Sequence, residues 1–457
     1  MTRADGAADE VVAPRKAKAA VPTGGRLVPL IMLALSVGVV GTIGEFVLGQ
    51  LGWAFNAELG VPVAAIGSLA SAMFIAAGIA SPASGWLVDH VAPKVLLPVQ
   101  AALAIAAFAS FALARNEMDL LLVCIAVGVC MTIGLPLTNR MIALYLPARQ
   151  HAVAVGWKSL GVQLSAVLVG LSFGGLAEVI EWRTIIWLWV GVSVAMTVCG
   201  GWYLARTPRL DRAAGAAGAA DATAGAGGVD GAGGAVEPAS PSAPAPVPAP
   251  RDRHHPVVWW LLPISFFFIG AFSSLGAYLP SFAIDQLGLG VGVAGLGMVV
   301  AATTSVVSRF VWLRLMRNVH GMTLLAAAGV LTAIGGAMLM VSPAIGEWFF
   351  WTAVVVLGAV ALGSFPVGAV LLIQYANVAK IGAISAWSGL AGFAGLAVQP
   401  LFQSLLIEEG GLTAGWLVVV AGGLLTTLTV GVYFVVQSRS RAHRPVRRRR
   451  RRCRASA

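Results

Sequence analysis

The segment GLPLTNRMIALYLPARQHAVAVGWKSL, residues 134–160, decides the fold of this chain because it occurs twice. The second copy is SFPVGAVLLIQYANVAKIGAISAWSGL, residues 364–390, and it aligns with the first at one constant offset without a gap. The matched positions are Pro136 with Pro366, Tyr145 with Tyr375, Trp157 with Trp387, and Leu160 with Leu390. Each copy contains two apolar runs joined by a short polar break. The repeat indicates a molecule built from two similar halves.

The composition of the chain places those halves in a membrane. Of its 457 residues, 58% are hydrophobic and only 11% are charged, and the mean hydropathy is +0.86. A soluble protein of this size cannot bury so much apolar surface. Apolar runs of about 20 residues recur along the sequence, and each is long enough to cross the hydrocarbon layer. The pattern excludes a β-barrel, whose strands would alternate apolar and polar residues. We therefore expect an all-α membrane protein.

The apolar runs predict twelve transmembrane helices. In the first half they lie at 27–51, 63–87, 95–114, 119–145, 152–177 and 184–205, and in the second half at 257–282, 292–313, 321–342, 348–375, 381–406 and 412–436. An even number of spans places both termini on one side of the membrane. With the termini in the cytoplasm, 25 Lys and Arg residues fall inside and two fall in the outer loops, which the positive-inside rule favours. We expect a multi-pass protein of the bacterial cytoplasmic membrane, with both termini cytoplasmic.

The segments between these runs define the domains. Residues 27–206 form a predicted N-terminal six-helix bundle and residues 257–436 a C-terminal one. Residues 1–26 are a predicted disordered N-tail, and the Ala-, Gly- and Pro-rich residues 207–256 are a predicted disordered cytoplasmic linker. Residues 437–457 form a polybasic cytoplasmic tail, which we expect to attract anionic lipids.

A loop motif after the second span resembles the major facilitator superfamily of transporters. That family carries Gly-x-Leu-Ala-Asp-Arg-x-Gly-Arg-Lys at this place, and this chain has GWLVDHVAPK at residues 85–94. Gly85, Leu87, Asp89 and Lys94 match the family pattern. The resemblance covers nearly the whole chain except the tails and the linker. It implies two pseudo-symmetric six-helix bundles that rock around a site at the middle of the membrane, which is transport by alternating access.

Two further elements extend the resemblance. Residues 181–183, Glu-Trp-Arg, resemble the Gly-Trp-Arg often found before the sixth span of that superfamily. Asn139-Arg140, together with GWKSLGV at residues 156–162, is similar to patterns in bacterial members grouped near the cyanate- and organic-anion-type carriers.

The matched loop predicts a gate at the cytoplasmic mouth, formed by Gly85, Asp89 and Lys94. The Asp89 carboxylate could accept hydrogen bonds from the amides that begin span eleven, near residues 381–382, where the helix dipole is positive. The alternative is a loop acid that only pairs with Lys94. Small faces for close helix approach are predicted at Gly170-x-x-x-Gly174 in span five, at Gly295 with Gly297 in span eight, and at Gly389-x-x-Gly392-x-x-Gly395 in span eleven.

Four charged side chains fall well inside the predicted spans, namely Glu45, Arg140, Lys158 and Arg309. A charged residue in lipid is costly, so each should face protein or water, and the default interpretation is a substrate or ion pathway. The second copy of the repeat has no cation at the matching positions, because Arg140 aligns with Val370 and Lys158 with Ser388. A buried cation pair is therefore expected in the first half alone.

An anion is the natural partner for Arg140 and Lys158. Spans four and five are antiparallel, which brings the two cations into one neighbourhood, where they repel unless an anion shares the site. Arginine can grip a carboxylate with two hydrogen bonds, and lysine acts as a point charge. The alternatives are a structural Arg140 tying spans one and four, and a Lys158 that extends to the cytoplasmic interface. Arg309 is expected to extend to the interface in the same way.

Glu45 is the only acid well within a span, and three roles stay open for it. It could carry a coupling proton, balance the charge of Arg140, or bind a cationic substrate. Further candidates for lining the substrate site are Gln163, Tyr278, Gln374 and Trp387.

These residues predict a secondary active transporter for a small solute, an organic anion coupled to protons. The alternatives are an efflux carrier for an amphipathic drug or metabolite and a membrane sensor on a carrier scaffold. We expect no enzymatic activity, no catalytic residue, no metal and no cofactor other than an ion gradient. The expected partners are the small-molecule substrate and anionic lipids, with no nucleic acid, and we expect a monomer.

Overall fold

The computed structural model describes residues 27–145, 154, 157–158, 160–177, 179–205, 257–375 and 381–442. Every regular element among these residues is an α-helix or a π-helical turn, so the all-α prediction is confirmed. The predicted N-tail, the predicted linker and the Arg-rich run at 444–454 lie outside the described residues.

The helices follow the twelve predicted apolar runs in order. The first half holds α1 (Leu27–Gln50), α2 (Gly52–Leu59), α3 (Ala65–His90), α4 (Pro93–Leu113), α5 (Glu117–Tyr145), α7 (Leu160–Val169), the π-helical turn η2 (Gly170–Gly174) and α8 (Trp182–Ala205). The second half holds α10 (Val257–Leu287), α11 (Val291–Leu315), α12 (Gly321–Ile345), α13 (Glu347–Leu357), the π-helical turn η3 (Gly358–Leu362), α14 (Phe365–Tyr375), α15 (Ile381–Gly415) and α16 (Leu417–Ala442).

Ten helical segments among the described residues are long and apolar enough to cross a membrane. Leu35–Gln50 and Gly52–Leu59 together give an eleventh, bent by 59° between α1 and α2. A shorter apolar helix over Leu160–Gly174 occupies the place predicted for the fifth span. The arrangement is consistent with twelve spans.

The chain turns sharply after the bend, where α2 ends at Gly60. This residue has a φ of 66° and a ψ of 18°, a left-handed conformation that glycine adopts without steric cost. Its amide donates to the carbonyl of Phe55 and so closes the last turn of α2. The turn allows α3 to start five residues later and run back alongside α5.

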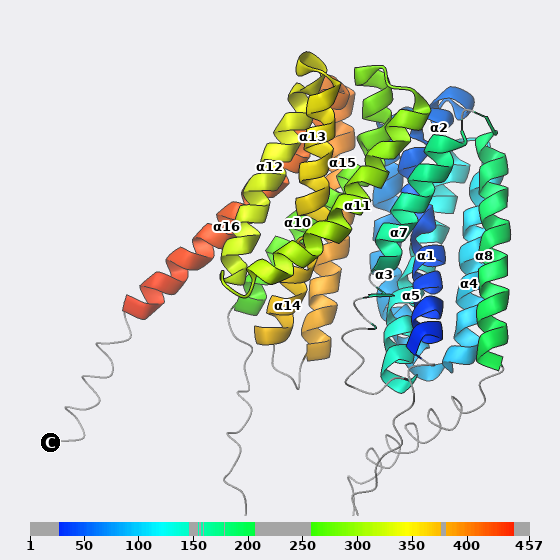
Figure 1. The fold of residues 1–457 in the computed structure, drawn as a ribbon, viewed down its shortest axis with the longest axis horizontal. Helices are drawn as coiled ribbons and strands as arrows, with labels where there is room; N and C mark the ends of the chain where they lie inside the picture. The colour runs from blue at the N-terminus through cyan, green and yellow to red at the C-terminus, as the bar shows by residue number, and fades with distance from the viewer. Residues whose placement is uncertain are drawn as a thin grey trace, which may run out of the picture.

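Figure 1 shows α1 to α8 on one side of the molecule and α12 to α16 on the other, with α11 leaning between them. We call the end that carries α2 the α2 end. The opposite end is the one at which α1 and α10 begin and α3 finishes. Helices α3 and α15 lie antiparallel to each other across the two halves.

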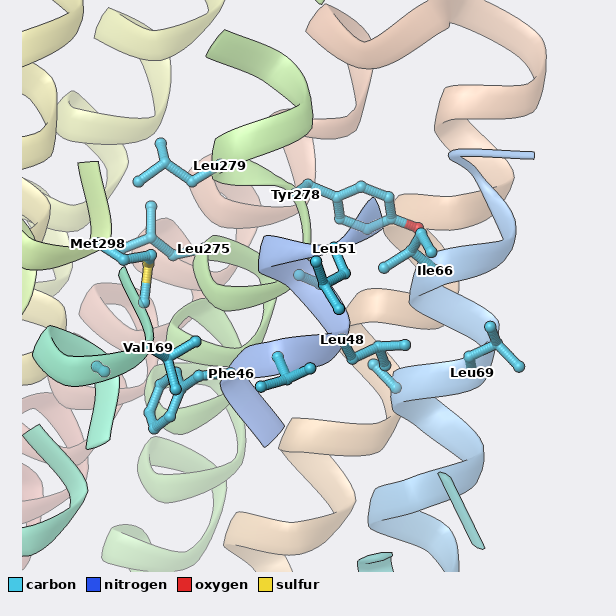
Figure 2. Close-up of a cluster of buried hydrophobic side chains, with 14 of the residues drawn as sticks. Phe46, Leu48, Leu51, Ile66, Leu69, Val169, Leu275, Tyr278, Leu279 and Met298 are labelled. Carbon is cyan, nitrogen blue, oxygen red and sulfur yellow. The ribbon is translucent and has the colours of Figure 1, made fainter. Parts of the chain in front are cut away.

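Among the described residues, the hydrophobic core joins the two halves toward the α2 end. One continuous cluster of buried side chains contains Phe46 of α1, Leu51 at the bend between α1 and α2, Leu275 and Tyr278 of α10, and Met298 of α11. Figure 2 shows these side chains meeting between the helices. The ring of Phe46 lies edge-on to that of Phe272, with 5.9 Å between the ring centroids. Burial of such rings away from solvent holds the halves together at this end.

Toward the opposite end the core divides into two separate clusters, one in each half. The first half has a cluster with Leu33 of α1, Val88 of α3 and Met141 of α5. The second half has its own cluster with Leu261 of α10 and Tyr433 of α16. Among the described residues the halves are thus packed against each other at the α2 end and packed only internally at the opposite end.

Candidate functional site

Glycines allow the two halves to approach closely at the α2 end. A Cβ added at Gly49 of α1 would overlap the carbonyl group of Gly276 on α10. A Cβ at Gly174 would lie 2.9 Å from the Cα of Gly295 on α11, and one at Gly170 would lie 2.9 Å from the carbonyl oxygen of Gly295. The prediction that Gly170, Gly174 and Gly295 provide small faces for close helix approach is confirmed at this crossing.

The contact between α3 and α15 follows one face of α3 and then stops. Gly67 approaches the carbonyl of Pro400, and a Cβ at Gly78 would lie 3.9 Å from the Cβ of Phe393. Gly85 is seven residues further along α3, which is close to two helical turns, so it lies on the same face. A Cβ at Gly85 would meet nothing within 4 Å, and the same holds for Gly389 of α15. The two helices therefore diverge toward the opposite end.

A pocket lies where this contact between the halves begins, with Glu45 in its wall. The pocket is small and is formed by α1, α3 and α10. Its lining includes Glu45 and Phe46 from α1, Met73 and Phe74 from α3, and Phe272 and Ser273 from α10. Glu45 is half-buried, and its carboxylate is the only charged group among the residues that line this pocket. The arrangement places one acid against both halves of the molecule.

Arg140 of α5 is held by the end of α3. Its Nη1 donates to the carbonyl oxygens of Val88 and Val91, the second at 3.0 Å. These carbonyls belong to the last turn of α3 and the residue after it, where carbonyl groups lack partners within the helix. The structural alternative expected Arg140 to tie spans one and four, whereas its contacts tie spans two and four. Both acceptors are neutral carbonyl oxygens.

Lys158 bonds to Asn139, the residue that precedes Arg140. Its Nζ donates to Oδ1 of Asn139 at 2.5 Å, and the side chain is 6% exposed. Asn139 directly precedes Arg140 in α5, so the two cations belong to one neighbourhood, as their spacing in the sequence predicts. Gln163 is buried in α7, five residues after Lys158 in the sequence.

The remaining lining candidates are spread over the molecule. Tyr278 is buried at the α2 end, where its hydroxyl bonds to the start of α3. Gln374 is exposed near the end of α14, and the side chain of Trp387 on α15 is 56% exposed. Arg309 is buried in α11. The structure brings Arg140 and Lys158 together and leaves Tyr278, Gln374 and Trp387 apart from them.

The three predicted gate residues lie at the opposite end, where the halves diverge. Gly85 and Asp89 are on the face of α3 that continues from Gly67 and Gly78, and Asp89 is exposed. Lys94 is exposed in the first turn of α4. Among the described residues, α3 and α15 are apart at this end.

A polar cluster of Glu58, Trp182 and Arg183 lies at the α2 end. The sequence did not predict this interaction. The carboxylate of Glu58 on α2 accepts a hydrogen bond from Nε1 of Trp182 at 2.8 Å and one from Nη1 of Arg183 at 2.5 Å. The guanidinium of Arg183 also lies over the Trp182 ring, 4.2 Å from its centroid. The Trp-Arg pair was visible in the sequence, but its partner lies more than 120 residues away and had no local signal.

The family assignment follows from comparison with known proteins. The family model described as Major Facilitator Superfamily matches residues 33–400. The chain belongs to the major facilitator superfamily. It is therefore a multi-pass membrane transporter rather than an enzyme. A search of curated proteins found no significant match.

Solved structures of this superfamily share the fold at low sequence identity. A D-xylose–proton symporter superposes with a TM-score of 0.66 at 14% identity, covering 88% of this chain and 97% of the symporter. A nucleoside transporter gives 0.62 at 12% identity, covering 89% and 99%. A bacterial homologue of the human lysosomal transporter Spinster, described as inward-facing and occupied, gives 0.63 at 14% identity, covering 89% and 96%. Such identities establish the fold alone.

Proposed function

We propose that this transporter moves a small organic anion by alternating access and couples its movement to protons. The observation that carries the proposal is the pair of cations Arg140 and Lys158, whose observed hydrogen bonds go to neutral oxygens of Val88, Val91 and Asn139. Two positive charges gathered in a membrane bundle are costly unless an anion shares their site. An anionic substrate entering from the open end would meet them first.

Glu45 is the proposed proton carrier. It lines the pocket that touches both halves, so rocking of the halves would change its surroundings and its access to water. A carboxyl group that exchanges a proton between two such surroundings couples proton movement to the conformational cycle. The counter-charge role is less favoured, because Arg140 is engaged by α3.

The proposed gate would close at the opposite end by extending the existing contact between α3 and α15. That contact pairs Gly78 with Phe393. Eleven residues further along each antiparallel helix, Asp89 comes opposite Gly382, in the first turn of α15. Amides in the first turn of a helix lack partners, and the helix dipole favours a carboxylate there. Closing would therefore bring the Asp89 carboxylate to these amides.

We further infer that the opposite end faces the cytoplasm of a bacterial cell, because the segments predicted to lie there carry 25 of the 30 Lys and Arg residues. The Arg-rich tail would then contact anionic lipids of the inner leaflet. In this orientation the end at which α3 and α15 diverge would face the cytoplasm.

Substitution by glutamine tests the anion site, because glutamine removes the charge and keeps an N–H donor. Arg140→Gln can still donate to the α3 carbonyls, and Lys158→Gln can still donate to Asn139. We expect each variant to fold and to lose at least tenfold in affinity for the anionic substrate, as measured by ligand-induced thermal shifts over a panel of carboxylates. Truncating one partner of a buried, hydrogen-bonded charge pair typically lowers the binding affinity by this much or more.

The matched control is Arg309→Gln, which removes a buried cation from α11 in the other half. Binding should persist in that variant. The proposal is wrong if the Arg140 and Lys158 variants bind the same anions with unchanged affinity, or if the parent protein responds only to neutral or cationic compounds.

A further inference from the structure

One side chain of the second half completes the start of a helix in the first half. Tyr278 of α10 is 1% exposed, and its hydroxyl donates to the carbonyl oxygen of Ala64 at 2.7 Å. The same hydroxyl oxygen accepts from the backbone N–H of Gly67 at 2.8 Å. Figure 2 shows the ring extending from α10 with its oxygen beside Ile66 at the start of α3. These two bonds cross between the halves at the α2 end.

The start of α3 has no side-chain cap of its own, although the amide of Gly67 also donates to the carbonyl of Ala64 at 3.2 Å. Its N-cap residue is Ala64, which makes no side-chain hydrogen bond to the first turn. Helices normally begin at Ser, Thr, Asp or Asn, whose side chains bond to the free amides of the first turn. Here the Tyr278 hydroxyl takes that place, from a residue more than 200 positions further along the chain. The cap exists only while the two halves are in contact.

The fit depends on glycine at position 67. A Cβ at Gly67 would overlap the Tyr278 hydroxyl and the carbonyl oxygen of Pro400. Pro400 lies on α15, so three helices meet around this one position. The tyrosine therefore bonds at a place where no larger residue would let the halves close.

We propose that Tyr278 is a latch that holds the α2 end shut by capping α3 across the two halves. The inference rests on the alternating access of the proposed function, but not on the chemistry of the substrate. When the α2 end opens, the amide of Gly67 and the carbonyl of Ala64 lose this partner and become available to water. Water can replace both bonds, so the latch is reversible. The side chain is a positioning residue, since it sets which end of the molecule is closed.

Cysteine reactivity tests the latch without any substrate. Ser281 lies one turn beyond Tyr278 on α10, is 1% exposed, and sits close to Gly52, where an added Cβ would be 2.9 Å from the serine Oγ. Ser281→Cys, in a background with the four native cysteines replaced, reports opening of the α2 end through its rate of reaction with a hydrophilic maleimide. Tyr278→Phe removes only the hydroxyl. We expect it to raise the reaction rate about tenfold, the effect of losing one to two net hydrogen bonds.

Two controls separate latch opening from general unfolding. Tyr433→Phe changes a tyrosine that is 3% exposed within the separate cluster of the second half, and it should leave the rate at position 281 unchanged. Ala328→Cys reports on that same cluster, where Ala328 is fully buried. Tyr278→Phe should leave the reactivity at position 328 unchanged.

Gly67→Ala provides a second route to the same result, because it keeps the hydroxyl and blocks its approach. It should also raise the rate at position 281. Unchanged reactivity at position 281 in the Tyr278→Phe variant overturns the latch, as does an equal rise at positions 281 and 328. Because none of these measurements involves substrate, a failure of the anion proposal would leave the test of the latch intact.

Discussion

Gly389→Leu should lock the transporter with its opposite end open. Gly389 lies on the face of α15 that carries Phe393, and a Cβ there meets nothing within 4 Å. The observed conformation can accept a leucine at this position, and the helix gains about 1 kcal/mol because leucine is a better helix former than glycine. Folding and insertion should therefore be normal or improved.

The cost appears only when the opposite end closes. Counting from the contact between Gly78 and Phe393, four residues along each helix bring Gly389 opposite Pro82. A leucine placed in a close helix contact of this kind costs roughly 1–3 kcal/mol through overpacking. At about 1.4 kcal/mol per tenfold, this lowers the population closed at that end by roughly 5- to 150-fold.

The assay follows the α2 end, which opens when the opposite end closes. The maleimide reaction of Ser281→Cys should slow by the same factor in the Gly389→Leu background, and transport should fall in parallel. Gly395→Leu is the comparison variant on the same helix, because a Cβ at Gly395 would overlap the carbonyl of Phe266. It should lower expression and melting temperature. Normal transport by Gly389→Leu would refute the predicted register of closure.

Two further predictions concern Glu45 and Glu58. Glu45→Gln keeps the shape of the side chain and removes its proton exchange. Counterflow of labelled substrate in proteoliposomes should therefore continue, while accumulation driven by a pH gradient is lost. Loss of both activities would instead indicate a role of Glu45 in substrate binding. Glu58→Ala removes both bonds to α8 and should lower the free energy of unfolding by roughly 1–2 kcal/mol, seen as a reduced melting temperature. Glu181→Ala is its control, since that acid is 60% exposed and 3.5 Å from Arg183, and it should have little effect.

The order and limits of the helices could be predicted from the sequence for local reasons. A span is a continuous apolar run whose length is set by the thickness of the membrane, so each run predicts one helix. The predicted run at 292–313 corresponds to α11 at Val291–Leu315, and the run at 321–342 to α12 at Gly321–Ile345. The glycine pattern at 170 and 174 likewise marked a close helix crossing, although it did not name the partner helix.

The candidate site could be predicted only in part. The neighbourhood of Arg140 and Lys158 followed from two consecutive antiparallel spans, because a short connection fixes which helix ends meet. The partner of Arg140 did not follow, since the carbonyls at the end of α3 are backbone groups that give no sign in the sequence. Tyr278 was expected to line the substrate site. Its observed partners are the backbone groups of Ala64 and Gly67, which likewise give no sign in the sequence.

The sequence by itself determined that this chain crosses the membrane many times, repeats its architecture, and carries the unmatched pair Arg140 and Lys158 in its first half. These properties depend on composition and on spacing within a few helical turns. The tertiary structure alone decided which end is closed, which acid lies between the halves, and which hydroxyl caps α3. Those properties depend on contacts between helices more than 200 residues apart, which form or separate as the halves move and leave no local pattern in the chain.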